Sequence, residues 1–103
     1  MPIKTLGTYN YYVYIITNKS KTALYVGFTN DLKTRLYYHS NPEANSKHFS
    51  HRYRCKYLIY FEHYDSAEIA IEREKQIKRW NRKKKEQLIE RMNPNWKFLN
   101  NSI

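Results

Sequence analysis

Two short runs of aromatic and β-branched residues, separated by a polar turn, constrain this chain more than any other feature. Residues 11–16 and 23–28 each have the composition of a β-strand, and residues 17–22 between them are polar. Two such runs predict an antiparallel hairpin with a longer loop. Because side chains alternate along a strand, Tyr12 and Tyr14 are expected to share one face of the hairpin.

The rest of the chain predicts one more strand and three helices. Residues 32–39 follow a capping sequence and have helical spacing, and Pro42 ends this segment. Residues 57–61 form the most apolar run, which predicts a third strand at the centre of the sheet. Residues 66–80 and 82–92 again have helical spacing. The order β-β-α-β-α-α predicts an α+β fold with a small, three-stranded, mainly antiparallel sheet flanked by helices.

Length and composition fit one small domain. The chain has 103 residues, of which 41% are hydrophobic, enough for a single core. We expect an N-terminal lead-in over residues 1–10, one domain over 11–99 and a short tail over 100–103. No run resembles a membrane-spanning helix or a signal peptide, and the lone Cys55 cannot form an internal disulfide. These features predict a cytoplasmic protein without membrane contact, which we expect to be a monomer or a weak dimer.

A strong positive charge indicates a polyanionic partner. The chain carries 19 Lys and Arg against 9 Asp and Glu, a net charge of +10, which favours contact with nucleic acid. Charge alone separates neither DNA from RNA nor a binding protein from an enzyme, and it would also serve solubility or ribosome association. The candidate contact residues are Arg52, Arg54, Lys75, Lys78, Arg79, Arg82, Lys83, Lys84 and Lys85.

An acidic residue interrupts the apolar stripe of the second predicted helix. Glu74 lies three or four residues from Ala70 and Ile77, so it falls within that stripe. A carboxylate near a core is costly unless it is paired or bound to a cation. An ion pair with Lys78 or a solvated stripe edge would explain it, and so would binding of a hard divalent ion such as Mg²⁺.

Arg35 and His39 are four residues apart and therefore share a face of the first helix. They are either two surface polar residues or a phosphate-binding guanidinium beside an imidazole that exchanges a proton near neutral pH. Tyr14 and Tyr25 allow the same pair of interpretations, because a tyrosine ring fills a core while its hydroxyl remains available for chemistry.

Five segments in this order make up a recognisable set of motifs. They are Tyr12-Val13-Tyr14, Tyr25-Val26-Gly27, and residues 29–36, 73–80 and 93–96. Together they resemble the GIY-YIG nuclease superfamily, which includes the N-terminal catalytic domain of the excision-repair nuclease subunit UvrC. The resemblance is strongest to the small stand-alone proteins built from this domain alone, in which the first glycine of the family name is often replaced, as it is here by Tyr12.

The resemblance implies a metal-dependent endonuclease that hydrolyses phosphodiester bonds in nucleic acid, expected to be DNA, in repair or recombination. Glu74 would hold one Mg²⁺ or Mn²⁺ ion, Arg35 would bind the scissile phosphate, and His39 would position or exchange a proton. Tyr14 is the first choice for the base that takes a proton from water, and Tyr25 is the alternative. Arg35 and the metal are expected to favour the phenolate of this base.

Two other functions fit the same residues. One is a nucleic-acid-binding module that keeps the fold and performs no chemistry, which predicts salt-sensitive binding without cleavage. The other is a subunit that acts only within a larger complex, with a protein partner that the sequence does not identify. A cleavage screen over several forms of nucleic acid separates both from an active nuclease.

Overall fold

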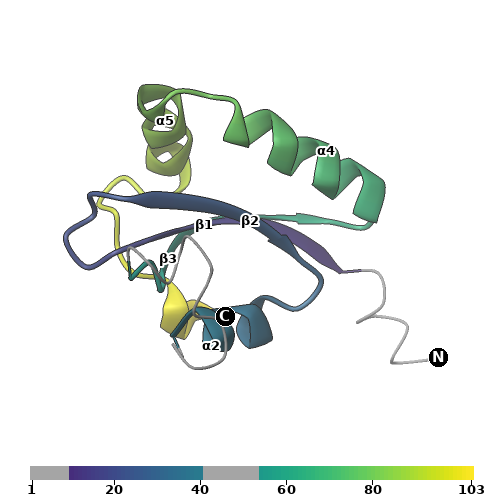
Figure 1. Ribbon diagram of the computed structural model, residues 1–103, viewed down its shortest axis with the longest axis horizontal. Helices are drawn as coiled ribbons and strands as arrows, with labels where there is room; N and C mark the ends of the chain where they lie inside the picture. Colours follow the sequence, from purple (N-terminus) through teal and green to yellow (C-terminus); the bar gives the residue numbers. More distant parts are fainter. Residues whose placement is uncertain (1–9, 41–53) are drawn as a thin grey trace.

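The computed structural model describes residues 10–40 and 54–103, and these residues form the predicted α+β fold (Figure 1). The bounds are β1 Tyr11–Thr17, β2 Leu24–Thr29, α2 Leu32–Ser40, β3 Tyr57–Tyr64, α4 Ala67–Lys78, α5 Arg82–Met92 and the short 3-10 helix η2 Asn100–Ser102. Each predicted segment overlaps an observed one. The largest difference is in β3, which continues from its predicted end at Phe61 to Tyr64.

The first strand, β1, is the central strand of an antiparallel sheet with the order β2-β1-β3. The prediction that the third strand lies at the centre is therefore wrong. Ile59 and Tyr60 pack on one face of the sheet and Leu58 packs on the other, so β3 is buried on both faces although it lies at an edge. The continuous apolar run reflects burial by two layers rather than a central position.

Helices cover both faces of the sheet. Figure 1 shows α4 and α5 on one side and α2 with η2 on the other. Ile15 of β1 belongs to the first side and packs with Ile77 of α4 and Ile89 of α5. The next residue, Ile16, belongs to the second side and packs with Leu36 of α2. This alternation follows from the two-residue period of a strand, and it leaves β2 and β3 at the rims of the sheet.

Asparagine side chains hold the C-terminal segment against β3. Asn93, which ends α5, is buried; its amide donates to the carbonyl oxygens of Ile59 (3.0 Å) and Lys97 (2.8 Å) and accepts from the Lys97 N–H (3.0 Å). Asn100 accepts a hydrogen bond from the backbone N–H of Leu58 at 2.9 Å. The segment that we predicted as a short tail is thus docked on the sheet.

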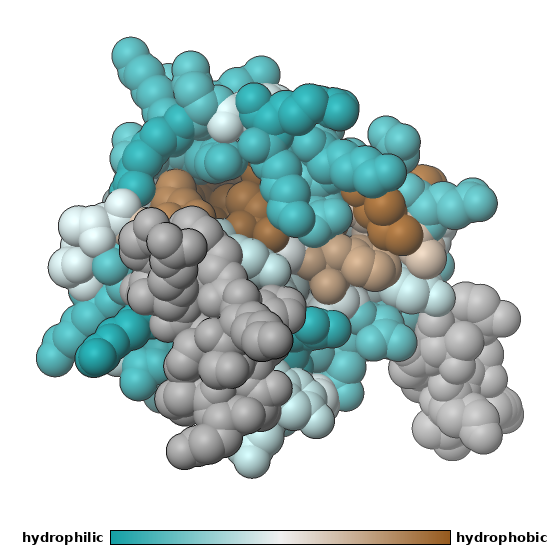
Figure 2. All heavy atoms as spheres, viewed as in Figure 1, coloured by the Kyte–Doolittle hydropathy of each residue, from teal (hydrophilic) through white to brown (hydrophobic). Residues whose placement is uncertain are grey.

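Polar side chains cover the outer surface of the molecule above the sheet. In Figure 2, hydrophilic residues spread over the layer of α4 and α5, and apolar residues show in the band between that layer and the part of the molecule below it. Within residues 10–40 and 54–103, no helix is both long enough and apolar enough to cross a bilayer.

Candidate active site

The ring of Tyr14 lies over the edge strand β2 at Gly27. The two residues are partners in the register of β1 and β2. A Cβ atom added to Gly27 would come within 2.9 Å of Cε1 of Tyr14, and closer still to Cζ and the hydroxyl oxygen. A glycine at this position therefore leaves the space that the phenol occupies, which explains why the tripeptide Tyr25-Val26-Gly27 ends in glycine.

His39 joins the two tyrosines of the adjacent strands. Its Nε2 lies 2.9 Å from the hydroxyl oxygen of Tyr14 in a buried hydrogen bond. Its ring meets the rings of Tyr14 and Tyr25 edge to face, at centroid distances of 5.8 and 5.4 Å. His39 is 4% exposed, so it is not a surface polar residue. The predicted pair of phenols therefore shares one imidazole.

Arg35 comes from the same helix, one turn before His39, and is half-buried. The start of this helix is fixed by Asp31, whose carboxylate accepts hydrogen bonds from the backbone N–H (3.2 Å) and the hydroxyl (2.8 Å) of Thr34. The guanidinium is close enough to influence the titration of Tyr14. The structure thus brings Arg35, His39 and Tyr14 together.

Glu74 approaches from α4, which covers the opposite face of the sheet. Its Oε2 lies 2.9 Å from Nζ of Lys78, and the two side chains are 17% and 50% exposed. The predicted ion pair with Lys78 is therefore present. The charge of the Glu74 carboxylate also acts to raise the pKa of Tyr14. Because β2 is an edge strand, groups from both helical layers can converge around it.

The phenol of Tyr14 is held in its protonated form. Burial raises its pKa well above the ordinary value of 10, the neighbouring Tyr25 and Glu74 act in the same direction, and Arg35 acts against them. Arg35 thus favours the phenolate as predicted, but the net direction for the protein alone is the opposite, because desolvation of a buried anion outweighs one nearby cation. Tyr14 therefore presents a hydroxyl, and not a standing phenolate, to its partner His39.

The carboxylate of Glu74 could hold a divalent cation of one particular kind. Among the described residues, no three His, Cys, Asp or Glu side chains are grouped closely enough to form a metal cluster. Mg²⁺ is commonly held by one or two carboxylates while water and substrate phosphate oxygens complete its shell. A single, partly exposed carboxylate paired with an exposed lysine suits that mode, and it does not suit a closed structural site.

The predicted nucleic-acid-binding cations differ in their surroundings. Arg52 lies outside the described residues. Arg82 has a structural role. Its guanidinium donates to the carbonyl oxygens of Thr22 (2.6 Å) and Lys21 (2.9 Å) and so joins α5 to the turn between β1 and β2. Lys85 is half-buried, and burial together with the charge of Arg82 lowers its pKa. Besides Arg82, the exposed members of the set are Arg54, Lys75, Lys78, Arg79, Lys83 and Lys84.

The sequence did not single out a carboxylate network that orients α4. Arg73, the residue before Glu74, donates to both carboxylate oxygens of Glu62 on β3, each at 2.9 Å. Tyr60 and Tyr64 donate to the same carboxylate. This bidentate pair joins α4 to β3 at the residue next to Glu74. The available signal was the acid among the aromatic residues of β3.

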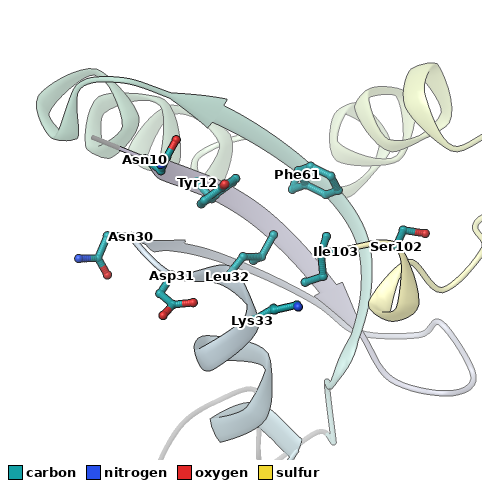
Figure 3. A pocket seen from close by; sticks show the side chains of 9 residues that line it. All are labelled: Asn10, Tyr12, Asn30, Asp31, Leu32, Lys33, Phe61, Ser102 and Ile103. Carbon is teal, nitrogen blue, oxygen red and sulfur yellow. The ribbon is translucent and has the colours of Figure 1, made fainter. Parts of the chain in front are cut away.

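A cavity of about 710 Å³ lies beside this site. Figure 3 shows it between β1, the start of α2 and the C-terminal segment, with Tyr12, Phe61, Leu32 and Ile103 among its lining residues. It opens on the same face of the sheet as Tyr14, but none of the four groups assembled around β2 lines it. It therefore belongs to the neighbourhood of the candidate site and not to its chemical centre.

Comparison with known proteins places the chain among small proteins of similar length. The GIY-YIG catalytic domain matches residues 10–87. The chain is 38% identical to a UPF0213 protein of Haloquadratum walsbyi over 78% of its length and 86% of the relative, and 39% identical to one of Syntrophus aciditrophicus over 81% and 92%. The solution NMR structure of a UPF0213 protein of Bacillus halodurans covers 84% of the chain and 89% of its own, with a TM-score of 0.53 and 30% identity.

Proposed function

The chain belongs to the GIY-YIG catalytic domain family, and from that premise we propose that it is a metal-dependent endonuclease that hydrolyses phosphodiester bonds in DNA. One observation carries the proposal: the hydroxyl of Tyr14 is hydrogen-bonded to His39 in a site that Arg35 and Glu74 both influence. A hydroxyl, an imidazole, a guanidinium and a carboxylate are the groups that hydrolysis of a phosphodiester uses.

Arg35 would bind the scissile phosphate. A guanidinium donates two parallel hydrogen bonds to phosphate oxygens and remains charged at any physiological pH. Because Arg35 is half-buried, its interaction with the phosphate would be screened less than that of a surface lysine. Charge that builds on the nonbridging oxygens as water attacks would be stabilised at this point.

The hydrogen bond between Tyr14 and His39 provides a path for the proton of the attacking water. With Nε2 of His39 unprotonated, the Tyr14 hydroxyl can give its proton to the imidazole as it takes one from the water. The bond from the water oxygen to phosphorus forms, the bond to the leaving oxygen breaks, and that oxygen is protonated by solvent. The high pKa of Tyr14 is compatible with this role, because the phenol loses one proton as it gains another and no stable phenolate is needed.

Glu74 would hold the divalent cation, Mg²⁺ or Mn²⁺. When bound, such an ion would polarise the phosphate and neutralise the leaving oxygen. Lys78 would have to leave the carboxylate, and the bound ion would replace its positive charge beside Glu74. The exposed lysines and arginines of α4 and α5 would bind the DNA backbone, and the activity would serve repair or recombination in the cytoplasm.

A cleavage screen tests the proposal. The purified protein would be incubated with Mg²⁺ or Mn²⁺ and with duplex, single-stranded and branched DNA, and with RNA. Glu74→Gln and Arg35→Gln should each lower the cleavage rate by at least about 100-fold without loss of DNA binding. Glu72→Gln, which removes an exposed acid of the same helix, is the matched control and should leave the rate unchanged. Full activity of Glu74→Gln would overturn the site.

Comparison of Tyr14→Phe with Tyr25→Phe decides which tyrosine passes the proton. The hydrogen bond to His39 predicts that Tyr14→Phe loses about 100-fold or more in rate and Tyr25→Phe loses much less. The reverse order would assign the proton step to Tyr25, whose ring also contacts His39.

A module that binds DNA without cutting it is the second candidate. Two observations favour it. The raised pKa of Tyr14 keeps its hydroxyl protonated, and Lys78 pairs with the carboxylate of Glu74, so neither group is in the state that proton transfer or metal binding requires. It predicts salt-sensitive binding and no cleavage with any metal or substrate in the same screen.

A further inference from the structure

Two aromatic rings form an exposed stack at the end of the sheet where the turn between β1 and β2 lies. Tyr57, the first residue of β3, stacks on Phe98 of the C-terminal segment with ring centroids 4.2 Å apart and ring planes 17° apart. Phe98 is 38% exposed, although a phenylalanine is ordinarily a core residue. The stack therefore keeps part of its aromatic surface accessible to solvent.

Cations surround the stack. Nζ of Lys21 lies 5.2 Å from the centroid of Phe98, and Nζ of Lys56 lies 5.7 Å from that of Tyr57. Tyr57 and Lys56 also line two hollows of about 410 and 360 Å³. Among the described residues that line these hollows are lysine, arginine, serine and asparagine, and none of them is acidic. The surface is thus aromatic and positively charged at the same place.

Hydrogen bonds fix the backbone beside the two lysines of the stack. Arg82 holds the carbonyl oxygens of the turn at Lys21, and the Asn100 amide donates to the carbonyl oxygen of Lys56 at 3.0 Å. Lys21 and Arg54 both have left-handed backbone conformations, with φ of 60° and 59°, which residues with a Cβ adopt at a cost. Lys21 over Phe98 and Arg54 in the lining of one hollow are therefore held in backbone conformations that the local sequence alone would not favour.

The hollow beside Phe98 begins at the end of the helix that carries the candidate active site. Ser40 lines it together with Lys56, Tyr57 and Phe98. The residue before Ser40 is His39, which is hydrogen-bonded to Tyr14. One wall of this hollow is therefore formed by the helix that also carries Arg35 and His39.

We propose that Tyr57 and Phe98 form a subsite for an unpaired nucleobase of the bound DNA, with Lys21 and Lys56 on the phosphates that flank it. A base with a free face stacks on an aromatic ring, and lysines beside the ring neutralise its phosphates. Bases inside a continuous duplex are stacked on their neighbours and cannot offer that face. The base would take the place of the Lys21 ammonium over Phe98. The subsite deepens the proposed nuclease function and relies on it for the placement of the cut phosphate.

Binding without cleavage tests the subsite separately from the nuclease. Fluorescence anisotropy would follow a labelled oligothymidylate and a blunt duplex of the same length, both in EDTA. Phe98→Leu should weaken oligothymidylate binding about tenfold, which is the effect of one lost stacking contact, and leave duplex binding nearly unchanged. Phe98→Tyr should restore the affinity, because it keeps an aromatic face.

Tyr37→Leu is the matched control, because Tyr37 is an aromatic residue that is 61% exposed on α2 and lies outside the stack. It should bind oligothymidylate as the wild type does. Equal binding by the wild type and Phe98→Leu, or an equal loss with Tyr37→Leu, would overturn the subsite. Circular dichroism would verify that each variant is folded. An absence of cleavage by a protein that shows this binding pattern would count against the nuclease and not against the subsite.

Discussion

Substitution of Gly27 by alanine should destabilise the domain although it adds only one methyl group. The added Cβ would overlap the ring of Tyr14, which is 1% exposed and cannot move into solvent. Overpacking of this kind costs about 1–3 kcal/mol, and displacement of the ring would also weaken the buried hydrogen bond to His39, worth about 1 kcal/mol. Alanine recovers about 0.5–1 kcal/mol of backbone entropy relative to glycine.

The net loss is therefore about 2 kcal/mol, and urea unfolding followed by circular dichroism would measure it. For a domain of this size that loss lowers Tm by roughly 10 °C. A measured cost near zero would mean that Tyr14 relaxes easily and that Gly27 is not required by its ring.

A double-mutant cycle isolates the contact that causes the loss. In the Tyr14→Val background the ring is absent, so Gly27→Ala should become neutral or stabilise by up to about 0.5 kcal/mol. The coupling between the two positions should be about 2 kcal/mol or more. Tyr14→Phe keeps the ring but not the hydroxyl, so most of the Gly27→Ala cost should remain in that background. The same penalty in the Tyr14→Val background as in the wild type would refute the explanation.

Two further predictions concern groups that hold α4 and the C-terminal segment. Burial acts to raise the pKa of Glu62, but the hydrogen bonds from Arg73 and the two tyrosines, with the charge of Arg73, hold it below 4.5. The carboxylate therefore stabilises the fold above that pH, and acid titration should lower the free energy of unfolding as pH falls below it; Glu62→Gln should flatten this part of the profile. Asn93→Ala leaves the carbonyl of Ile59 and the N–H of Lys97 without this partner and should cost about 3 kcal/mol in urea unfolding, whereas a change of the exposed Asn95 to Ala should cost little.

Local sequence patterns located the helices and strands, because the conformation of a short segment depends largely on its own residues. The polar turn and the two aromatic runs predicted the hairpin, and the proline boundary predicted the end of α5 at Met92. Strand order is not local. The apolar run of β3 is explained equally by a central strand or by an edge strand covered on both faces, and the second is what the chain adopts. Only the pairing of the strands distinguishes them, because β1 pairs with both β2 and β3.

The geometry of the site was predictable where it follows from one element and not where it depends on two. Arg35 and His39 share a helix, so their common direction followed from spacing. The register that places Tyr14 on Gly27 and the ion network from Arg73 to Glu62 join separate elements. The protonated state of Tyr14 likewise depends on burial by the whole fold, which the sequence pattern of two short strands does not contain.

The ion pair between Glu74 and Lys78 does not oppose a role for Glu74 in metal binding. A carboxylate on the apolar side of α4 needs a counter-charge when no substrate is present, and a lysine one turn away supplies it at 2.9 Å. The lysine is half exposed, so its ammonium can turn to solvent when a divalent cation with twice its charge, fixed also by a phosphate, takes its place. Lys78→Gln should therefore weaken DNA binding through the loss of one cation, but at saturating DNA it should leave the cleavage rate intact or lower the metal concentration that cleavage needs, while Glu74→Gln abolishes cleavage. Loss of cleavage in both variants alike would mean that the ion pair itself, and not the free carboxylate, is what the site requires.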